Sequence, residues 1–251
     1  MEDSKIAWTD HTFNPWIGCT KASPGCANCY AKAQQDDWLR KAEWGPNGTR
    51  VRTGPDTWAK PTEWNREAQR TGTRLKVFCA SLADVFEDRA ELAPWRDEVH
   101  TLINETPHLD WQILTKRPEV AAEYYRTHSL PSNVWLGTSV EDRARAAQRI
   151  PILRQIKATV RFLSIEPLLE DLGPLDLSGI HWVIVGGESG PLARPMQREW
   201  VDSIWTQCNA QSVPFFFKQW GGRRRDKGGC LVSGREMKQW PQGHSAASRL
   251  Q

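Results

Sequence analysis

Short runs of apolar, β-branched and aromatic residues recur along the chain, and each run ends abruptly in polar residues. Runs of four or five such residues without polar alternation are typical of strands in a parallel sheet that is covered on both faces. The pattern therefore predicts core strands in the runs Val77–Ala80, Trp111–Leu114, Val134–Gly137, Val160–Leu163, Trp182–Val185 and Pro214–Phe217.

Segments with helical spacing separate most of these runs. Apolar residues recur every three or four positions in residues 92–103, 144–156 and 201–208. Strand and helix then alternate at intervals of about 20 to 35 residues, as in βαβ units joined by right-handed crossovers. Residues 168–179 contain Pro174 and several Asp and Gly residues, which predict a loop in place of one helix. The pattern predicts an α/β fold whose sheet curls toward a barrel or stays open and doubly wound.

Polar side chains stand just beyond the end of each predicted strand. In parallel α/β folds the loops after the carboxyl ends of the strands converge on one mouth, where the active site lies. Strand ends face water and are usually polar whatever the function, so the repetition of this feature is what predicts a site. The residues concerned are Ser81, Asp84, Thr115, Lys116, Ser139, Glu141, Glu166, Glu188, Ser189 and Lys218.

Composition limits the class of protein. A chain of 251 residues with 39% hydrophobic residues and a formal net charge of +3 can bury a large core in one domain. No stretch approaches the roughly 18 uninterrupted apolar residues of a membrane span, and the start lacks the pattern of a secretory signal. We therefore expect a cytoplasmic protein without a membrane partner. The near-balanced charge gives no strong nucleic-acid footprint.

Three of the six cysteines, Cys19, Cys26 and Cys29, fall within eleven residues in a C-x6-C-x2-C arrangement. Such a cluster fits a cofactor site in a reducing compartment better than a disulfide framework. Three thiolates on a metal or cluster that prefers four ligands leave one position open, which suggests catalysis. A zinc site that adds His11 as fourth ligand is the alternative.

Further blocks of sequence accompany the cysteines. They include Ile6–Asp10, Asn14–Trp16, Leu114–Pro118, Ser139–Glu141, Leu163–Leu168, Val185–Gly190 and Phe217–Gly221. In these blocks and in the cysteine motif the chain resembles the phage-associated three-cysteine-motif family, a radical-SAM-like family without a settled function. The resemblance extends from the start of the chain to about Gly222.

The resemblance implies a partial (β/α) TIM-like barrel over residues 1–222, with a cluster loop at residues 18–30 that binds a [4Fe-4S] cluster and S-adenosylmethionine (SAM). An external electron donor would reduce the cluster, SAM would be cleaved, and the resulting 5′-deoxyadenosyl radical would abstract hydrogen from a substrate. The cofactor supplies this chemistry, while the protein supplies orientation and electrostatics. Whether a partner protein delivers the substrate is left open.

Two departures from the superfamily pattern affect the expected roles. The first two cysteines are separated by six residues in place of three, and Asn28 stands where an aromatic residue usually precedes the last cysteine. The Gly-Gly-Glu that commonly holds the SAM amino group after the second strand is replaced by Ser81–Asp84, and Gly186–Glu188 comes later in the chain.

We accordingly expect Asp84, with Ser81 beside it, to bind the SAM amine. Lys116 or Arg117 would pair with the SAM carboxylate, and Ser139 and Glu141 would hydrogen-bond the ribose hydroxyls. The catalytic candidates that remain for the substrate half of the mouth are Glu166, Glu188 and Lys218. The competing account of Glu188 and Lys218 is a buried structural ion pair.

Two segments stand apart from the strand–helix rhythm. Residues 45–74 are rich in Gly, Pro, Arg and Lys and predict an irregular loop insertion, and Trp38, Trp44, Trp58 and Trp64 lie in or near it. Tryptophans among basic side chains can stack on bases, so a nucleotide or nucleic-acid substrate is one hypothesis. A non-catalytic, metal-stabilised nucleic-acid-binding protein is the alternative function, and tryptophans that pin a loop to the barrel are the structural alternative. Residues 223–251 predict a basic, flexible tail.

Overall fold

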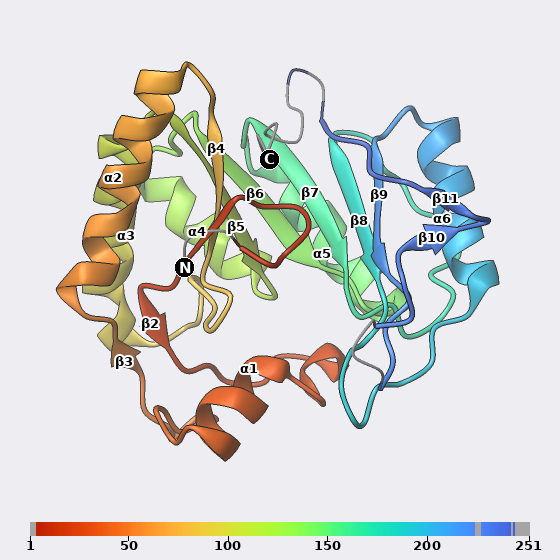
Figure 1. The fold of residues 1–251 in the computed structure, drawn as a ribbon, viewed down its shortest axis with the longest axis horizontal. Helices are drawn as coiled ribbons and strands as arrows, with labels where there is room; N and C mark the ends of the chain where they lie inside the picture. The colour runs from red at the N-terminus through yellow and green to blue at the C-terminus, as the bar shows by residue number, and fades with distance from the viewer. Residues whose placement is uncertain (1–3, 224–226, 242, 244–251) are drawn as a thin grey trace.

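The computed structural model describes residues 4–223, 227–241 and 243. Its centre is a seven-stranded sheet in which neighbouring strands are parallel and follow one another in chain order. The sheet curls into an open half-barrel (Figure 1). Its strands are β1 (His11–Phe13), β4 (Leu75–Cys79), β5 (Leu109–Thr115), β6 (Val134–Ser139), β7 (Val160–Ile165), β8 (Trp182–Gly186) and β9 (Phe215–Gln219).

Helices between successive strands cover the outer face of this sheet (Figure 1). From β7 the chain passes to β8 through residues 166–181, which are described throughout and contain no helix. This segment places Leu168, Leu172, Leu175 and Leu177 in the core, so the predicted loop is confirmed. The helices are α2 (Pro55–Thr71), α3 (Ala93–Glu105), α4 (Pro118–Thr127), α5 (Arg143–Gln155) and α6 (Arg198–Ala210).

Both faces of the sheet are buried, which explains the continuous apolar runs. Because side chains alternate along a strand, one set packs against the helices and the other lines the inside of the half-barrel. The inner set forms an aromatic cluster made of Trp8, Phe78, Trp135, Phe162, Trp182 and Phe216. Trp8 comes from the amino-terminal segment, and Trp240 from the opposite end of the chain stacks on Trp182 at 5.0 Å. The interior of the half-barrel below its mouth is therefore filled with side chains.

Gly137 of β6 makes room for this inner aromatic cluster. A Cβ added there would lie 2.4 Å from the Phe162 ring, so Gly137→Ala is expected to overpack the interior. Overpacking of this kind costs about 1 to 3 kcal/mol of unfolding free energy, which urea denaturation measures. Gly54→Ala is the control, because nothing lies within 4 Å of the added Cβ. Equal stabilities of the two variants would contradict the expectation.

Residues 45–74 do not form the irregular loop insertion that their composition predicts. Most of the segment is α2, a 17-residue helix that begins at Pro55 and ends before Gly72, which has φ +68°. Proline in the first turn and a glycine with positive φ after the last turn are ordinary helix boundaries. The helix buries Trp64 and Ala68 against the barrel and tolerates Pro61 inside it. Ahead of it, β3 (Val51–Arg52) pairs with β2 (Trp16–Ile17).

The described part of the predicted tail packs on the barrel and so corrects the expectation of a flexible segment there. Beyond the small hairpin of β10 (Leu231–Val232) and β11 (Arg235–Glu236), the chain returns along β9. The backbone N–H of Phe217 donates to Met237 at 2.7 Å, and that of Gln239 donates to Phe215 at 3.0 Å. Covering β9 protects the backbone groups of an edge strand. Two of the three adjacent arginines and most of residues 242–251 lie outside the described residues.

Among the described residues, no helix combines the length and the apolar character needed to cross a bilayer.

Candidate functional site

The cysteine loop, residues 18–30, crosses the carboxyl ends of the strands, and α1 (Tyr30–Lys32) continues it along the lower edge of the sheet in Figure 1. The backbone N–H of Gly18 donates to Leu82, just beyond β4. The Tyr30 hydroxyl donates to the carbonyl of Ser81 at 2.9 Å. The loop therefore lies over the mouth where the polar strand ends meet.

Cys19, Cys26 and Cys29 are free thiols of intermediate burial. Burial, followed by the charges of Asp84 and Glu87, raises the pKa of the Cys19 thiol to about 12 although Arg117 opposes the shift. Within residues 4–223, 227–241 and 243, no three His, Cys, Asp or Glu side chains are grouped so that they could hold a metal ion. His11 stacks on Trp64 of α2 at 4.3 Å, a placement that gives no support to a zinc site with His11 as fourth ligand.

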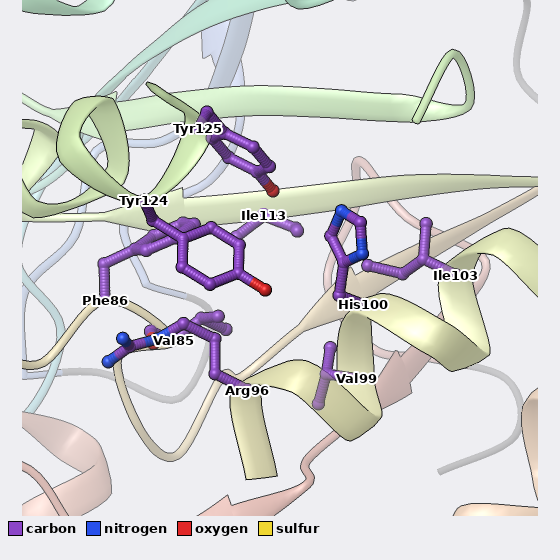
Figure 2. A pocket seen from close by; sticks show the side chains of 9 residues that line it. All are labelled: Val85, Phe86, Arg96, Val99, His100, Ile103, Ile113, Tyr124 and Tyr125. Carbon is purple, nitrogen blue, oxygen red and sulfur yellow. The ribbon is translucent and has the colours of Figure 1, made fainter. Parts of the chain in front are cut away.

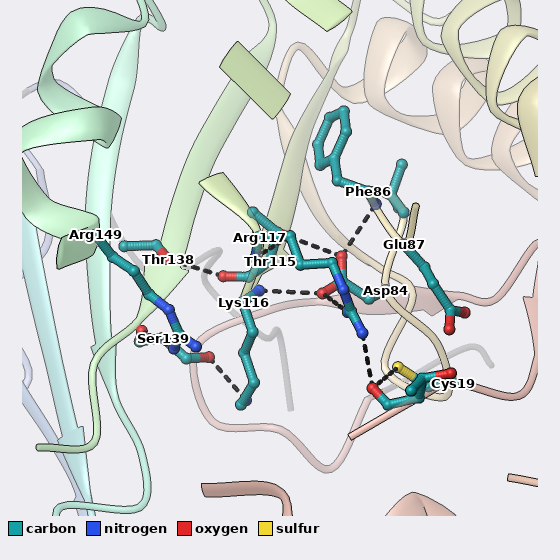
Figure 3. Close-up of polar contacts among 12 residues, drawn as sticks. Cys19, Asp84, Phe86, Glu87, Thr115, Lys116, Arg117, Thr138, Ser139 and Arg149 are labelled. Carbon is teal, nitrogen blue, oxygen red and sulfur yellow. Dashed lines mark hydrogen bonds and ion pairs between the residues drawn. The ribbon is translucent and has the colours of Figure 1, made fainter. Parts of the chain in front are cut away.

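Asp84 has both carboxylate oxygens engaged within the protein (Figure 3). Oδ1 accepts from the Thr115 hydroxyl at 2.7 Å and from the backbone N–H of Phe86 at 3.0 Å. Oδ2 accepts from the backbone N–H of Lys116 and from Arg117 Nη1 at 2.8 Å. Arg117 in turn donates to the carbonyl of Thr20 at 2.8 Å. Asp84 thus ties the ends of β4 and β5 to the cysteine loop and has little capacity left for a ligand amine.

A second arginine, Arg50, also contacts Thr20 of the cysteine loop. Arg50 donates through Nε and Nη2 to the two carboxylate oxygens of Glu87 at 2.7 and 2.6 Å, and the two side chains are only 1% and 3% exposed. Arg50 Nη2 also donates to the Thr20 hydroxyl at 2.9 Å. Two arginine–carboxylate pairs therefore fix Thr20, the residue after Cys19.

Glu141, which follows β6, is fully buried. Its Oε1 accepts from the backbone N–H of Gly25 at 3.2 Å, and its Oε2 accepts from Arg149 of α5 at 3.0 Å. Arg149 also donates to the carbonyl of Ser139 at 2.9 Å. The side chain that was expected to reach a ribose is thus directed to the cysteine loop.

Glu188, which follows β8, pairs with Arg194 rather than with Lys218. Arg194 holds both carboxylate oxygens and donates from Nη2 to the carbonyl of Pro24 at 3.1 Å. Asn28 Nδ2 donates to Glu188 Oε2 at 2.9 Å. Burial alone would raise the pKa of Glu188, but the hydrogen bonds from Arg194 and Asn28 hold it below its ordinary value. Glu188 is therefore ionised and bound to the loop.

Five other polar residues share the concave side of the strand ends and form the inner polar row. Two of them come directly after members of the inner aromatic cluster in the alternation of side chains along a strand, Ser164 after Phe162 and Lys218 after Phe216. Lys116 Nζ donates to the Ser139 hydroxyl at 3.0 Å, and Ser139 pairs in register with Ser164. Lys218 Nζ lies 2.9 Å from Glu166 Oε1. The row consists of Lys116, Ser139, Ser164, Glu166 and Lys218.

The remaining predicted cofactor residue, Ser81, exchanges hydrogen bonds with the Asn14 side chain at 3.1 and 3.2 Å. Its backbone carbonyl accepts the hydrogen bond from the Tyr30 hydroxyl of the cysteine loop. The predicted site residues therefore divide into two groups. Ser81, Asp84, Glu141 and Glu188 contact the loop or its supports, whereas Lys116, Ser139, Glu166 and Lys218 line the mouth.

Sequence reasoning missed the partners of these carboxylates. Arg50, Glu87, Arg149 and Arg194 carried no recognisable motif, and Arg117 was considered only for the SAM carboxylate. The clearest available signal was Arg149, a charged residue inside an otherwise apolar helical stripe, which in the structure is 3% exposed.

Two of the four tryptophans in or near the insertion, Trp58 and Trp64, are structural. Trp64 is 3% exposed, and Trp58 packs edge-on against Phe13 with Arg52 over its ring at 4.2 Å. Trp38 is 76% exposed at the end of the π-helical turn Ala33–Trp38. The structural alternative thus holds for Trp58 and Trp64 but not for Trp38.

Figure 2 shows a cavity on the outer side of the sheet, between α3, α4 and residues 85–86. Its volume is about 10 Å³, which is room for about one water molecule. It is lined by Val85, Phe86, Arg96, Val99, His100, Ile103, Ile113, Tyr124 and Tyr125, none of them in the inner polar row. This cavity is too small for a substrate.

Comparison with known proteins gives one family and one fold. A family model described as "Protein of unknown function (DUF5131)" matches residues 3–246. No curated protein matches the chain. A solved structure of a mutant spore photoproduct lyase with bound AdoMet and dinucleoside spore photoproduct is similar, with a TM-score of 0.51 and 13% sequence identity. The match covers 82% of this chain and 62% of that chain. The fold is thus a partial TIM-like barrel of the radical SAM type.

Proposed function

This chain belongs to the DUF5131 family of proteins of unknown function, and we propose that it is a radical SAM enzyme whose [4Fe-4S] cluster is held by Cys19, Cys26 and Cys29. One observation carries the proposal. A loop with three free thiols lies over the carboxyl ends of a parallel half-barrel, where α/β barrels place their active sites. The fold likeness to a protein that binds AdoMet supports it.

The donor set fits such a cluster in kind. Thiolates are the usual ligands of iron–sulfur clusters, and three of them leave one iron for a further ligand. None of the three thiols is spent in a disulfide. Because the described residues contain no ready three-donor group, cluster binding would have to draw the thiols together. The bound cluster would supply the electron for SAM cleavage, and the protein's own residues would bind and orient SAM and the substrate.

We assign the SAM carboxylate to Lys116. Its ammonium group donates to the Ser139 hydroxyl, and no carboxylate pairs with it among the described residues. Arg117, the other candidate, is already occupied by Asp84 and by the carbonyl of Thr20. A half-buried cation without a counter-ion suits an anionic group of a ligand. Ser139 beside it remains the candidate for a ribose hydroxyl.

The substrate half of the mouth falls to Glu166 and Lys218, which form an ion pair 2.9 Å apart at the ends of β7 and β9. A carboxylate and an ammonium group side by side can orient a polar substrate and hold a proton close to it. A nucleotide or nucleic acid is the first substrate class to test, because the similar structure holds a dinucleoside. An external electron donor, and a partner protein if one presents the substrate, complete the proposal.

The test is anaerobic purification, reconstitution with iron and sulfide, reduction with dithionite and assay for 5′-deoxyadenosine. Brown protein with about four irons per chain that forms 5′-deoxyadenosine from SAM is the expected result. A colourless protein with one zinc would reject the cluster. A stable reduced cluster that never forms 5′-deoxyadenosine would reject SAM cleavage.

Lys116→Met is expected to raise the KM for SAM roughly tenfold to a hundredfold while kcat changes less, because a hydrogen bond to a charged group contributes about 1.5 to 3 kcal/mol. Steady-state 5′-deoxyadenosine formation over a range of SAM concentrations measures the effect. Lys60→Met, in the exposed Lys60–Glu63 pair on α2, is the control. An unchanged KM in Lys116→Met would remove this residue from the SAM site.

A further inference from the structure

We propose that Glu141 and Glu188 are positioning residues, which hold residues 24–28 of the cysteine loop against the ends of β6 and β8. The inference rests on the proposed function only for what the loop binds. It assigns these two carboxylates to the protein's own backbone and side chains, and so withdraws them from the ribose and the substrate.

Glu188 binds Asn28, at the carboxyl end of the segment 24–28. Its Oε2 accepts from Asn28 Nδ2 at 2.9 Å, and the same amide group donates to the carbonyl of Leu192 at 2.9 Å. Arg194 binds both oxygens of Glu188 and reaches back to the carbonyl of Pro24. Residues 188–194 therefore form a strap that touches the loop on both sides of Cys26.

Glu141, which follows β6, binds Gly25 of the same segment. Its Oε1 accepts from the N–H of Gly25, and Arg149 holds its Oε2. A Cβ added at Gly25 would lie 3.1 Å from the Glu141 carboxyl carbon, a tight contact, so the absence of a side chain at Gly25 eases the close approach of this carboxylate. Cys26 directly follows the residue that is held.

Neither carboxylate has an oxygen to spare. Glu141 is fully buried and Glu188 is 7% exposed, and each accepts from both the loop and an arginine. Hydrogen bonds between a carboxylate and an arginine or an N–H group are strong when they are shielded from water, so these contacts resist exchange of partners. Their function is then to limit how far Cys26 and Cys29 can move.

The experiment measures thiol reactivity in the reduced, metal-free chain, so it does not depend on a cluster. The alkylation rates of Cys26 and Cys29 with N-ethylmaleimide are followed by peptide mass spectrometry, with buried Cys208 as an internal reference for global opening. Asn28→Ala removes the contacts to Glu188 and Leu192 without stripping any charge. We expect Cys26 to react roughly fivefold to tenfold faster, as loss of a charge-assisted hydrogen bond implies.

Arg143→Ala is the matched control, because the exposed Arg143–Asp171 pair has no contact with the loop, and its rates should equal those of the parent chain. Unchanged Cys26 and Cys29 rates in both Asn28→Ala and Glu188→Gln would overturn the proposal. A parallel gain at Cys208 would mean that the whole domain opens, and it would also count against the proposal.

Exchanging the donor and the acceptor between residues 28 and 188 tests whether the Asn28–Glu188 contact itself, rather than a general loosening of the loop, controls the alkylation rate. Asn28→Asp sets a second carboxylate against Glu188 and should speed alkylation of Cys26. Combining it with Glu188→Gln restores a donor–acceptor pair in reverse and should return the rate toward that of the parent chain. A double variant as reactive as Asn28→Asp alone would reject the pairing. An inactive parent enzyme would leave these outcomes unaffected, so failure of the proposed function is distinguishable.

Discussion

Cys26→Ala is expected to leave the reconstituted protein without a [4Fe-4S] cluster and to reduce 5′-deoxyadenosine formation to background. Iron–sulfur clusters of this kind need three thiolates from the loop, and removing one of them leaves two. Iron and sulfide content per chain and the electron paramagnetic resonance spectrum of the reduced protein measure the loss. Cys19→Ala and Cys29→Ala should behave alike.

The control is Cys230→Ala. Cys230 is another free thiol of intermediate burial, and it contacts Glu236 near the end of the described chain. Its removal should leave the iron content and the product unchanged. A Cys26→Ala protein that still holds four irons would show that the cluster lies elsewhere.

Glu87→Gln is expected to lower the unfolding free energy by about 3 to 5 kcal/mol, since it leaves the Arg50 guanidinium buried without its counter-ion. Both side chains are almost completely buried, and Arg50 also donates to three carbonyls in residues 45–49. Urea denaturation at neutral pH measures the change. Glu98→Gln is the control, because the Arg52–Glu98 pair is exposed and contributes at most about 1 kcal/mol.

The Arg50–Glu87 pair also predicts how the stability lost in Glu87→Gln depends on pH, and this dependence tests whether the ion pair is the cause. Burial alone would raise the pKa of Glu87, but Arg50 and the Thr20 hydroxyl more than offset this and hold it below the ordinary 4.5. A depressed pKa contributes stability above the unfolded value, and that stability is lost as the pH falls through the folded pKa. The difference between the parent chain and Glu87→Gln should therefore shrink below about pH 4.5. A constant difference down to pH 3 would contradict the assignment.

The strands could be predicted because burial on both faces leaves a continuous apolar run, and the runs from Val77 to Phe217 became β4 to β9. β1 escaped notice because its three residues include His11 and Thr12, whose polarity hides a buried strand. The helix over residues 143–155 was found, but its buried side carries Arg149. An arginine that is buried for its charge partner interrupts the apolar periodicity on which the prediction depends.

The site, like the fold, could be predicted from the sequence only in part. Strand order alone places Asp84, Glu141, Glu166 and Glu188 at the mouth, because carboxyl ends of parallel strands share an edge. Which of them face a ligand depends on arginines whose long side chains arrive from elsewhere in the chain. Arg194, for example, reaches Pro24 across 170 positions of sequence. Sequence spacing contains no information about such contacts, so polar residues with different roles looked equivalent.

The packed aromatic interior has a consequence for substrate access. Trp240 stacks on Trp182 and Trp8 meets Trp182 edge to face, so aromatic side chains close the inside of the half-barrel beneath the mouth. A polymer could not thread through it. If the substrate is the nucleic acid proposed above, we expect it to present an end or a single everted base to Lys116 and Lys218 while the remainder stays outside on the rim.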